Sequence, residues 1–379
     1  MIPFNKPFIV GNEIQNISKA VLSGQLAGNG AFTKKCQEFL ETRYDVGKAL
    51  MTASCTGALE MAAILCEIGP GDEVILPSYT FVSTANAFHL RGAKLIFADI
   101  EPDTLNLSLR STEAHLSTKT KAVCVVHYAG VGCDMDGYIA LCRQKNLKLV
   151  EDAAHAIGAY YKGKALGSFG DLSAFSFHET KNFIAGEGGA LGINNPSLVE
   201  RAEIIWEKGT NRSQFFRGLI DKYTWVDIGS SFLPSELITA FLYAQFEHAE
   251  EITKRRLSCW NHYRAGLESF EQQGLMRLPT IPSHCQHNAH TFFLLLENEK
   301  TRNALIGYLS KRGITVTFHY IPLHTSPMGL SMGYRPGMLP ITESVSGRIL
   351  RLPLFYDLRL EEQDQIMDGI TDFFGGAKS

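Results

Sequence analysis

Lys181 lies in the segment SFHETKNFIAGEGGA (176–190), between a short apolar run and a glycine-rich turn. A lysine in a loop is usually an exposed surface residue. A lysine that is withdrawn from water has a lowered pKa, and its neutral amine forms an imine with a carbonyl compound. The role of Lys181 therefore depends on the residues that the fold brings to it.

An acidic pair follows another apolar run. The residues LKLV lead directly into Glu151 and Asp152, and His155 follows three residues later. A carboxylate at the end of a buried strand is costly unless it meets a cation or a hydrogen-bond donor. Taken alone, Asp152 fits a helix N-cap equally well, and His155 is better explained as a capped or core histidine.

Two other apolar runs end in polar or aromatic residues. KALMT is followed by Ser54, Thr56 and Gly57 at the predicted start of a helix, where free N–H groups and the helix dipole favour a phosphate. An ordinary Ser/Thr cap is the alternative. EVILP is followed by Tyr79 and Phe81, which are either core residues or a platform for a planar ring. The chain has no G-x-x-x-x-G-K-[ST] loop and no G-x-G-x-x-G after a strand.

These features together match the needs of one cofactor. A phosphate cradle, a stacking ring, a strand-end carboxylate and a lysine follow one another along the chain. Pyridoxal phosphate (PLP) needs each of them, because the carboxylate keeps the pyridine nitrogen protonated and the lysine holds the aldehyde and later moves a proton. The residues therefore predict a PLP site.

The alternation of apolar and amphipathic runs predicts the strands and helices that must position this site. Between about residues 45 and 195, short apolar runs alternate with amphipathic stretches. This alternation predicts an α/β fold with a mostly parallel sheet covered by helices on both faces, and ligands collect at the carboxyl ends of such strands. The predicted strands are 48–52, 73–77, 93–99, 121–127, 147–152, 172–178 and 189–194, and the helices between them include 56–68, 83–92 and 136–146.

The second half of the chain predicts a smaller unit. One extended helix is expected over 235–267, and the proline-containing segment 278–286 is expected to be a linker. A strand, a helix, a strand and a final helix follow, over 290–298, 301–313, 315–320 and about 360–374. We therefore expect a large cofactor-binding domain, 1–272, and a small C-terminal α/β domain, 273–379.

Composition excludes several classes of function. The 379 residues carry a net charge of −3 without a basic block, which argues against nucleic acid as a partner. No apolar run approaches the roughly 18 residues of a membrane span, and the N-terminus resembles no targeting peptide. The eight cysteines form no C-x-x-C pair, and the cluster HCQHNAH (284–290) lacks a second ligand pair. We expect a cytoplasmic protein with reduced thiols, no metal and no membrane anchor.

Four segments carry a resemblance to a known family. EDAAHAIG, SFHETKNFIAGEGGA, PSYTFVSTANAF and FHYIPLH resemble signature segments of the DegT/DnrJ/EryC1/StrS sugar aminotransferases, and the similarity extends from FNKP to RLPLFYDL (351–358). The resemblance implies the type I fold of PLP enzymes and a homodimer with shared active sites. It also implies L-glutamate and a dTDP-linked keto sugar as substrates.

The resemblance assigns a role to each matching residue. Lys181 would be the imine-forming lysine, and Asp152 the partner of the pyridine nitrogen. The other cofactor residues would be Phe81 against the ring, Thr56 and Gly57 with Ser176 at the phosphate, His155 near the ring hydroxyl, and Ser231 in GSSF. Ser231 stands where many relatives have the Asn of G-Y-N-x-R, which reaches the neighbouring subunit's phosphate. His319, Tyr320 and Tyr79 are candidates for the sugar end.

A finer prediction concerns the product. The stretches MIPFNKP, SCTGALEMA, EKGTNRSQFFRG, DKYTW and DIGSS are most similar to members that aminate C4 of dTDP-4-keto-6-deoxy-D-glucose. The expected product is dTDP-4-amino-4,6-dideoxy-D-galactose, a precursor of enterobacterial common antigen. The C4 gluco epimer, a 3-keto substrate and a non-catalytic cofactor or sugar sensor stay open. A dehydratase is disfavoured, because that branch replaces the lysine by histidine, and this chain has Lys181.

Overall fold

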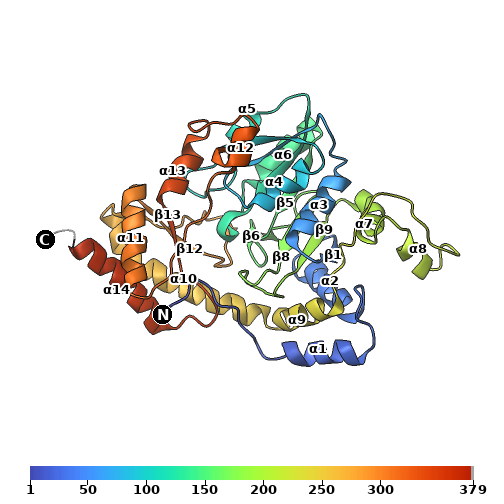
Figure 1. The fold of residues 1–379 in the computed structure, drawn as a ribbon, viewed down its shortest axis with the longest axis horizontal. Coiled ribbons are helices and arrows are strands. Elements are labelled where there is room, and N and C mark those ends of the chain that lie inside the picture. Colours follow the sequence, from blue (N-terminus) through green and yellow to red (C-terminus); the bar gives the residue numbers. More distant parts are fainter. Residues whose placement is uncertain (377–379) are drawn as a thin grey trace.

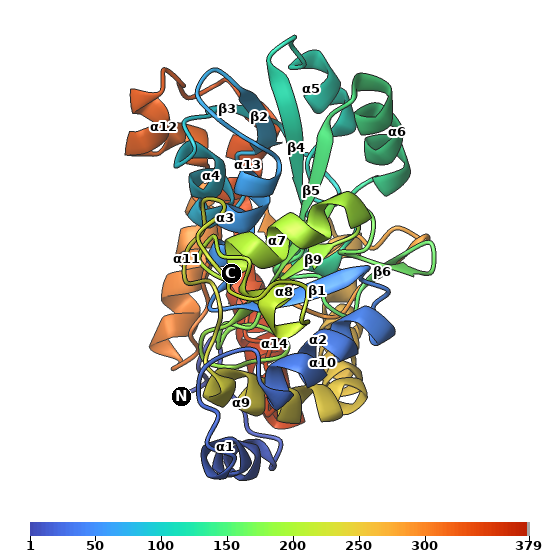
Figure 2. The same ribbon diagram turned by 90° about the vertical axis from the view of Figure 1, so that its right-hand side faces the viewer.

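A computed structural model describes residues 1–376, and Figures 1 and 2 show it from two directions. The strands are β1 (Lys48–Thr52), β2 (Glu73–Pro77), β3 (Lys94–Ala98), β4 (Thr120–Val126), β5 (Lys148–Asp152), β6 (Tyr160–Tyr161), β7 (Lys164–Ala165), β8 (Leu172–Ser176), β9 (Gly189–Ile193), β10 (Met276–Arg277), β11 (Cys285–Gln286), β12 (Phe292–Leu296) and β13 (Ile349–Leu352). The α-helices are α1 (Glu13–Leu22), α2 (Ala31–Arg43), α3 (Cys55–Leu65), α4 (Val82–His89), α5 (Leu109–Ala114), α6 (Met135–Lys145), α7 (Val199–Trp206), α8 (Arg212–Phe216), α9 (Glu236–Glu247), α10 (Ala249–Gln272), α11 (Glu299–Lys311), α12 (Pro327–Ser331), α13 (Pro340–Arg348) and α14 (Leu360–Gly376).

The large sheet has seven strands in the order β1-β9-β8-β5-β4-β2-β3. Only β9 runs against its neighbours, because it pairs antiparallel with both β1 and β8. The remaining pairs are parallel. Each of the seven strands coincides with a predicted apolar run, so the predicted mostly parallel α/β fold is confirmed.

Helices cover both faces of this sheet. In β4, Val123 and Val125 belong to a core shared with α2, α6 and α9, whereas Ala122 and Cys124 belong to a core shared with α3, α4 and α7. This division follows from the period of two in a β-strand, where successive side chains point to opposite faces. Figure 2 shows α3, α4 and α7 on one side of the sheet and α6 on the other. The carboxyl ends of the strands lie between these layers and open toward the C-terminal part of the chain.

The extended helix predicted over 235–267 is wrong, because the chain forms two helices there. α9 ends and α10 begins around His248, whose φ of −109° and ψ of 17° lie outside the helical region. The chain changes direction because α9 packs on α1 and α2, whereas α10 packs on β10 and α14 of the C-terminal part. The apolar stripe of the sequence continues through the break, so periodicity alone did not reveal it.

The C-terminal part contains a three-stranded antiparallel sheet, β10-β12-β13. Its core includes Trp260 and Tyr263 from α10 and Ile2 from the N-terminus, so both ends of the chain contribute to it. The prediction of a strand over 315–320 is wrong. This segment makes a single bridge, between Thr317 and Arg351, and then turns toward the large sheet. We keep the division between 1–272 and 273–379 as a proposal; of the small domain, 377–379 lie outside the described residues.

The predicted linker 278–286 is largely irregular, but its end forms β11, which pairs with β6 on the large domain. All eight cysteines are free, and seven of them are buried. Among the helices within residues 1–376, none combines the length and apolar character that crossing a bilayer requires.

Candidate active site

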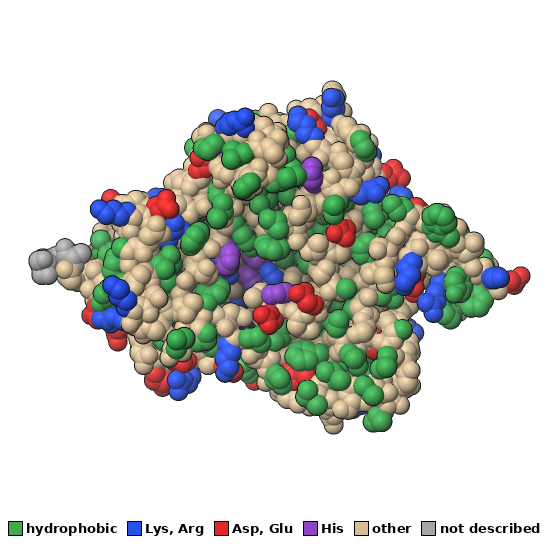
Figure 3. Space-filling view, in the orientation of Figure 1, with side chains coloured by type: hydrophobic (Ala, Val, Ile, Leu, Met, Phe, Trp, Pro, Cys, Tyr) green, Lys and Arg blue, Asp and Glu red, His purple; other side chains and the backbone are tan. Residues whose placement is uncertain are grey.

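A cavity of about 400 Å³ lies at the carboxyl ends of the large sheet, next to the C-terminal part. Figure 3 shows histidine side chains and a basic side chain gathered in a hollow near the centre of this face. Most of the predicted site residues line the cavity: Thr56, Phe81, Asp152, His155, Ser176, Lys181, His319 and Tyr320. Segments that are distant in sequence therefore meet as the sheet topology predicts.

Lys181 follows β8 in a tight turn and is partly buried. Its backbone N–H donates to the His178 carbonyl at 2.9 Å, which fixes where the side chain leaves the turn. Burial lowers the pKa of Lys181 to about 8, and the charge of Arg351 acts in the same direction. Cys55 and Asp152 oppose this shift without cancelling it. About a tenth of the lysine is therefore neutral at pH 7, far more than for an ordinary lysine, and a nucleophilic amine requires this neutral form.

Asp152 ends β5 and is 5% exposed. Its Oδ2 accepts a hydrogen bond from Thr84 Oγ1 at 2.7 Å, and its Oδ1 accepts one from the Ala154 N–H at 3.1 Å. Burial nevertheless raises the pKa of Asp152, because these donors and the charges of Lys181 and His127 only partly offset it. A carboxylate in this condition lacks a close cation, and a protonated pyridine nitrogen fits that need.

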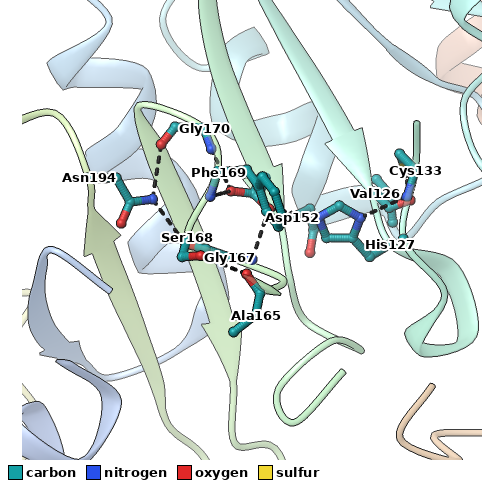
Figure 4. A network of polar contacts seen from close by, with 12 residues as sticks. Val126, His127, Cys133, Asp152, Ala165, Gly167, Ser168, Phe169, Gly170 and Asn194 are labelled. Atoms are coloured by element: carbon teal, nitrogen blue, oxygen red, sulfur yellow. Dashed lines mark hydrogen bonds and ion pairs between the residues drawn. The ribbon is translucent and has the colours of Figure 1, made fainter. Parts of the chain in front are cut away.

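Glu151, the residue before Asp152 on β5, is a second buried carboxylate, and Figure 4 shows its partners His127, Gly167, Phe169 and Gly170. Glu151 accepts hydrogen bonds from His127 Nε2 at 2.9 Å and from three backbone N–H groups of the 167–170 loop, at 2.6–2.8 Å. Burial raises the pKa of Glu151, but these donors outweigh burial and leave the pKa below its ordinary value. The ionised Glu151 therefore ties β5 to the start of β8, which fixes Asp152 and the turn of Lys181 relative to each other.

The N-terminus of α3 forms the expected phosphate end of the cavity. The Ser54 hydroxyl caps the helix by accepting a hydrogen bond from the Gly57 N–H at 3.1 Å, and Thr56 Oγ1 bonds Ser83 Oγ at 2.8 Å. Ser54, Cys55 and Thr56 line the cavity, but Gly57 does not. The first N–H groups of a helix have no partner within the helix, so this end suits an anion. The role of Gly57 stays a prediction.

Two stacked imidazoles form another wall. The rings of His155 and His290 lie 3.9 Å apart between centroids, and His290 Nδ1 bonds Asn182 Oδ1 at 3.0 Å. Burial lowers the pKa of both histidines well below the ordinary value, so both are neutral. His155 Nδ1 is buried and has no hydrogen-bond partner among the described residues. A nitrogen left without a partner in this wall fits the hydroxyl of a bound pyridine ring.

His319 and Tyr320 enter the cavity from the C-terminal part. His319 Nδ1 accepts a hydrogen bond from Arg351 Nη1 at 2.8 Å, because a guanidinium can only donate. Burial lowers the pKa of His319 to about 4, with Arg351 adding to the effect, so the neutral ring carries its proton on Nε2. Tyr79 does not line the cavity: it is buried behind these residues, and its hydroxyl donates to the His319 carbonyl. Its expected contact with a substrate stays a prediction.

Two other predicted residues are exposed. Phe81 is 57% exposed, and its ring centroid lies 6.4 Å from that of Tyr320, so one face is open to a planar ligand. Ser231 does not line the cavity of its own chain, and its backbone bridges to Glu207. Ser231 follows the α8 segment, which projects from the molecule on the right of Figure 1. This position leaves open its predicted contact with a neighbouring subunit.

Three important residues were missed from the sequence. Thr84 was overlooked because its partner Asp152 is distant in the chain. His290 belongs to the His/Cys cluster that was considered for metal, yet it stacks on His155, and within 1–376 no group of three or more potential ligands could hold a metal ion. Arg351 lines the cavity from β13. In the sequence it is the first residue of RLPLFYDL, the segment at which the family resemblance ends, and no role was predicted for it.

The family model described as the DegT/DnrJ/EryC1/StrS aminotransferase family matches residues 7–371. The chain belongs to this family. The spore coat polysaccharide biosynthesis protein SpsC of Bacillus subtilis is 31% identical, with 99% of this chain and 98% of SpsC covered. The aminotransferase TlmJ from Streptoalloteichus hindustanus is 29% identical, has a TM-score of 0.90, and is covered over 100% of both chains. The candidate sugar aminotransferase Spr1654 from Streptococcus pneumoniae, in its PLP form, is 26% identical with a TM-score of 0.91 over 99% of both chains.

This aminotransferase therefore uses PLP, and it is an enzyme of the sugar aminotransferase class. Its own residues fit the cofactor at three points: the under-partnered carboxylate of Asp152, the free Nδ1 of His155 and the open N-terminus of α3. Lys181 lies among them with a lowered pKa. The assignment of individual residues to atoms of the cofactor stays a prediction.

Proposed function

We propose that the protein transfers the amino group of L-glutamate to C4 of dTDP-4-keto-6-deoxy-D-glucose. The products would be 2-oxoglutarate and dTDP-4-amino-4,6-dideoxy-D-galactose, for a surface polysaccharide such as enterobacterial common antigen. The observation that carries the proposal is the joint position of Lys181 and Asp152 in one cavity of a sugar aminotransferase. The similarity of SpsC, a polysaccharide biosynthesis protein, supports the pathway class.

The proposed sugar substrate is supported by the position of the sequence stretches that are most similar to the C4-aminating members of the family. MIPFNKP supplies Phe4, which lines the cavity outside the expected phosphate end. Residues that face a cavity select its ligand more directly than distant ones do. The match of this stretch to enzymes that make the 4-amino galacto sugar therefore bears on the substrate, whereas SCTGALEMA supplies Ser54 through Thr56 at the expected phosphate end and bears on the cofactor.

When bound, PLP supplies an electron-withdrawing ring that stabilises the negative charge left when a proton leaves carbon. Asp152 lines the cavity, and its ionised form would hold the proton on the ring nitrogen. In the first half-reaction, Lys181 Nζ would accept the proton that leaves Cα of L-glutamate, and in the second it would donate a proton to C4 of the sugar. Its pKa of about 8 lets the same amine accept and donate near neutral pH.

The neutral histidines have a different task. His155, His290 and His319 all have lowered pKa values because of burial, so they orient ligands by hydrogen bonds and add no positive charge. His319, with its Nε2–H, and Tyr320, with its hydroxyl, line the same cavity as Lys181. We assign these two donors to the hydroxyl groups of the sugar.

We also propose that the enzyme is a homodimer with shared active sites. The segment around α8 is exposed and rich in large apolar side chains: Phe215, Phe216, Leu219, Tyr223, Trp225, Val226 and Ile228. An exposed patch of this kind is typical of an interface. Its continuation reaches Ser231, which would contact the cofactor phosphate of the second subunit. Sedimentation analysis tests the pairing, and a monomer at micromolar concentration would refute it.

The experiment that tests the proposed product is proton NMR after incubation with PLP, L-glutamate and dTDP-4-keto-6-deoxy-D-glucose. A small coupling between H3 and H4 indicates an axial amine and supports the galacto product. A large coupling indicates the gluco epimer and refutes the stereochemical part of the proposal. If this sugar is not aminated although the cofactor is bound, the 3-keto isomer becomes the substrate to test. A protein that binds PLP and aminates neither sugar would support a sensor.

A further inference from the structure

Ser78, His324 and Glu343 form a chain of hydrogen bonds outside the cavity. Ser78 follows β2, His324 belongs to the short 3₁₀ helix Leu323–Thr325, and Glu343 belongs to α13. Ser78 Oγ and His324 Nδ1 lie 2.7 Å apart, and His324 Nε2 and Glu343 Oε1 lie 3.0 Å apart. Ser78 and His324 are fully buried, and none of the three residues lines the cavity. Because it is costly to withdraw such polar groups from water, the chain requires a reason.

The direction of each hydrogen bond follows from the donors and acceptors available. Burial raises the pKa of Glu343, but hydrogen bonds from His324 and from the N–H groups of Gly337 and Leu339 outweigh burial and leave the pKa below its ordinary value. An ionised carboxylate only accepts, so His324 Nε2 donates to Glu343. Ser78 Oγ accepts the His324 backbone N–H at 3.0 Å, which leaves the hydroxyl hydrogen for His324 Nδ1. All three side chains are satisfied in this single arrangement.

Two consecutive residues after β2 hold the segment 319–324, which enters the cavity from the C-terminal part. Ser78 holds one end, because the Leu323 N–H donates to the Ser78 carbonyl at 3.0 Å. Tyr79 holds the other end, because its hydroxyl donates to the His319 carbonyl. The loop that follows β2 therefore sets the position of this segment relative to the large sheet.

The segment 319–324 has little regular structure of its own. Its first four residues belong to no helix or strand, so no ladder of backbone hydrogen bonds fixes them. The Tyr320 carbonyl instead accepts a hydrogen bond at 2.7 Å from Ser346 Oγ on α13. Glu343 lies three residues before Ser346 on the same helix, so the bond from His324 to Glu343 connects α13 with the loop after β2. Side-chain hydrogen bonds therefore determine where this segment lies.

We propose that His324 is a positioning residue for the sugar half-reaction, because it fixes the segment from which His319 and Tyr320 line the cavity. Without the imidazole, Ser78 and Glu343 each lose a partner, and the side-chain link between the loop after β2 and α13 is lost. A displacement of about 1 Å in groups that orient a substrate can lower a rate on the order of a hundredfold.

This inference deepens the proposed function and rests on it in one respect, that His319 and Tyr320 contact the keto sugar. Lys181 and Asp152 follow or end other strands, and no hydrogen bond joins them to His324, so the reaction with L-glutamate should depend little on this histidine. Cofactor absorbance follows each half-reaction separately, with L-glutamate alone or with the aminated cofactor and the keto sugar. If the wild type aminates no keto sugar, the proposed function and this inference both fail. If only the variants depart from expectation, this inference fails alone.

The test compares the wild type with His324→Leu, His324→Gln and Ser78→Ala. We expect His324→Leu to lower the second-order rate constant for the keto sugar on the order of a hundredfold, and to change that for L-glutamate by less than about threefold. His324→Gln should recover most of the sugar rate, since the amide offers Glu343 an N–H donor and Ser78 an oxygen acceptor. Ser78→Ala should lower the sugar rate up to about tenfold, since it removes one donor, and it decides the test if His324→Leu does not fold.

Ser108→Ala is the matched control. Ser108 is a buried serine whose Oγ likewise accepts a backbone N–H, that of Ser111 at 3.3 Å, and it does not line the cavity. Its substitution should leave both half-reactions unchanged. Thermal unfolding and cofactor absorbance establish that each variant is folded and loaded with PLP. Equal losses in both half-reactions of a folded His324→Leu, or an unchanged sugar half-reaction, would overturn the proposal.

A double-mutant cycle tests whether His324 acts through His319 and Tyr320. If it does, the combined substitution His319→Gln/Tyr320→Phe should lower the sugar rate much less in the His324→Leu background than in the wild type, because the two side chains are already displaced there. Effects that add in full would overturn the proposal and would assign His324 to the stability of the fold alone.

Discussion

The hydrogen bond from Thr84 to Asp152 yields a sharp prediction, because it joins α4 to the end of β5 inside the cofactor cavity. Thr84 Oγ1 donates to Asp152 Oδ2 at 2.7 Å, and both side chains are buried. Thr84→Val removes this donor with little change in shape. Burial already raises the pKa of Asp152, and Thr84 is the strongest of the influences that lower it again.

The magnitude follows from the strength of such bonds. A hydrogen bond to a charged group contributes about 1.5–3 kcal/mol, and 1.4 kcal/mol corresponds to tenfold in an equilibrium constant. The ionised Asp152 is the form that partners a protonated pyridine, so Thr84→Val should weaken PLP binding roughly tenfold to hundredfold. PLP binding should also be lost at a higher pH on the acid side than in the wild type, because a carboxylate with a raised pKa is protonated earlier as the pH falls.

Spectroscopic titration of the apoenzyme with PLP, between pH 5 and 8, measures both effects. Thr84→Ser keeps the hydroxyl and should bind PLP nearly as well as the wild type. Thr112→Val is a matched control, because Thr112 is also a fully buried helix threonine, its Oγ1 donates to the Ser108 carbonyl at 2.9 Å, and it does not line the cavity. Unchanged PLP affinity in Thr84→Val, or equal losses in Thr84→Ser and Thr84→Val, would refute the reasoning.

Further predictions concern the two ends of the Lys181–Asp152 pair and the carboxylate behind it. Lys181→Ala and Lys181→Arg should be folded but inactive in coupled turnover assays, because neither supplies a neutral amine; measurable turnover in either would contradict the role of Lys181. Asp152→Asn should lower kcat on the order of a hundredfold or more, since an amide cannot hold the ring nitrogen protonated; a kcat within a factor of three of the wild type would contradict this. The rate at which apoenzyme captures PLP should rise about tenfold per pH unit and level off above pH 8, as the amine of Lys181 loses its proton; a stopped-flow profile that is flat from pH 6 to 9 would contradict it. Glu151→Ala should lower the free energy of unfolding by about 3–5 kcal/mol, because it leaves His127 and three N–H groups without their acceptor. Since the pKa of Glu151 is lowered on folding, this difference is full above the ordinary carboxyl pKa and should shrink as the pH falls through the lowered value; denaturant titrations at pH 4 and 7 measure it.

Local sequence patterns predicted the large sheet well, because each of its strands is a buried apolar run. β2, β8 and β9 are buried at every position, and such runs are recognisable without knowledge of their neighbours. The break between helices α9 and α10 was not predictable from a local pattern. The division between α9 and α10 depends on which surfaces the two helices pack against, and that information is absent from helical periodicity.

The site residues also differ in how far the sequence predicts them. Lys181 and Asp152 are strand-end residues with unusual chemistry, and the topology of a parallel sheet suffices to bring them together. Thr84 and Arg351 act through tertiary contacts with Asp152 and His319, across long stretches of chain. A threonine in a helix and an arginine in a strand are common, so only the fold reveals their roles.

The measurement that tests the central claim most directly is transfer of the isotope from L-[15N]glutamate to the nucleotide sugar. Wild-type enzyme with PLP should place 15N on C4 of the sugar and release one 2-oxoglutarate for each amino group transferred. Lys181→Ala, loaded with PLP and assayed in parallel, should transfer none. Transfer by Lys181→Ala, or failure of the PLP-loaded wild type to aminate any keto sugar nucleotide, would contradict the account.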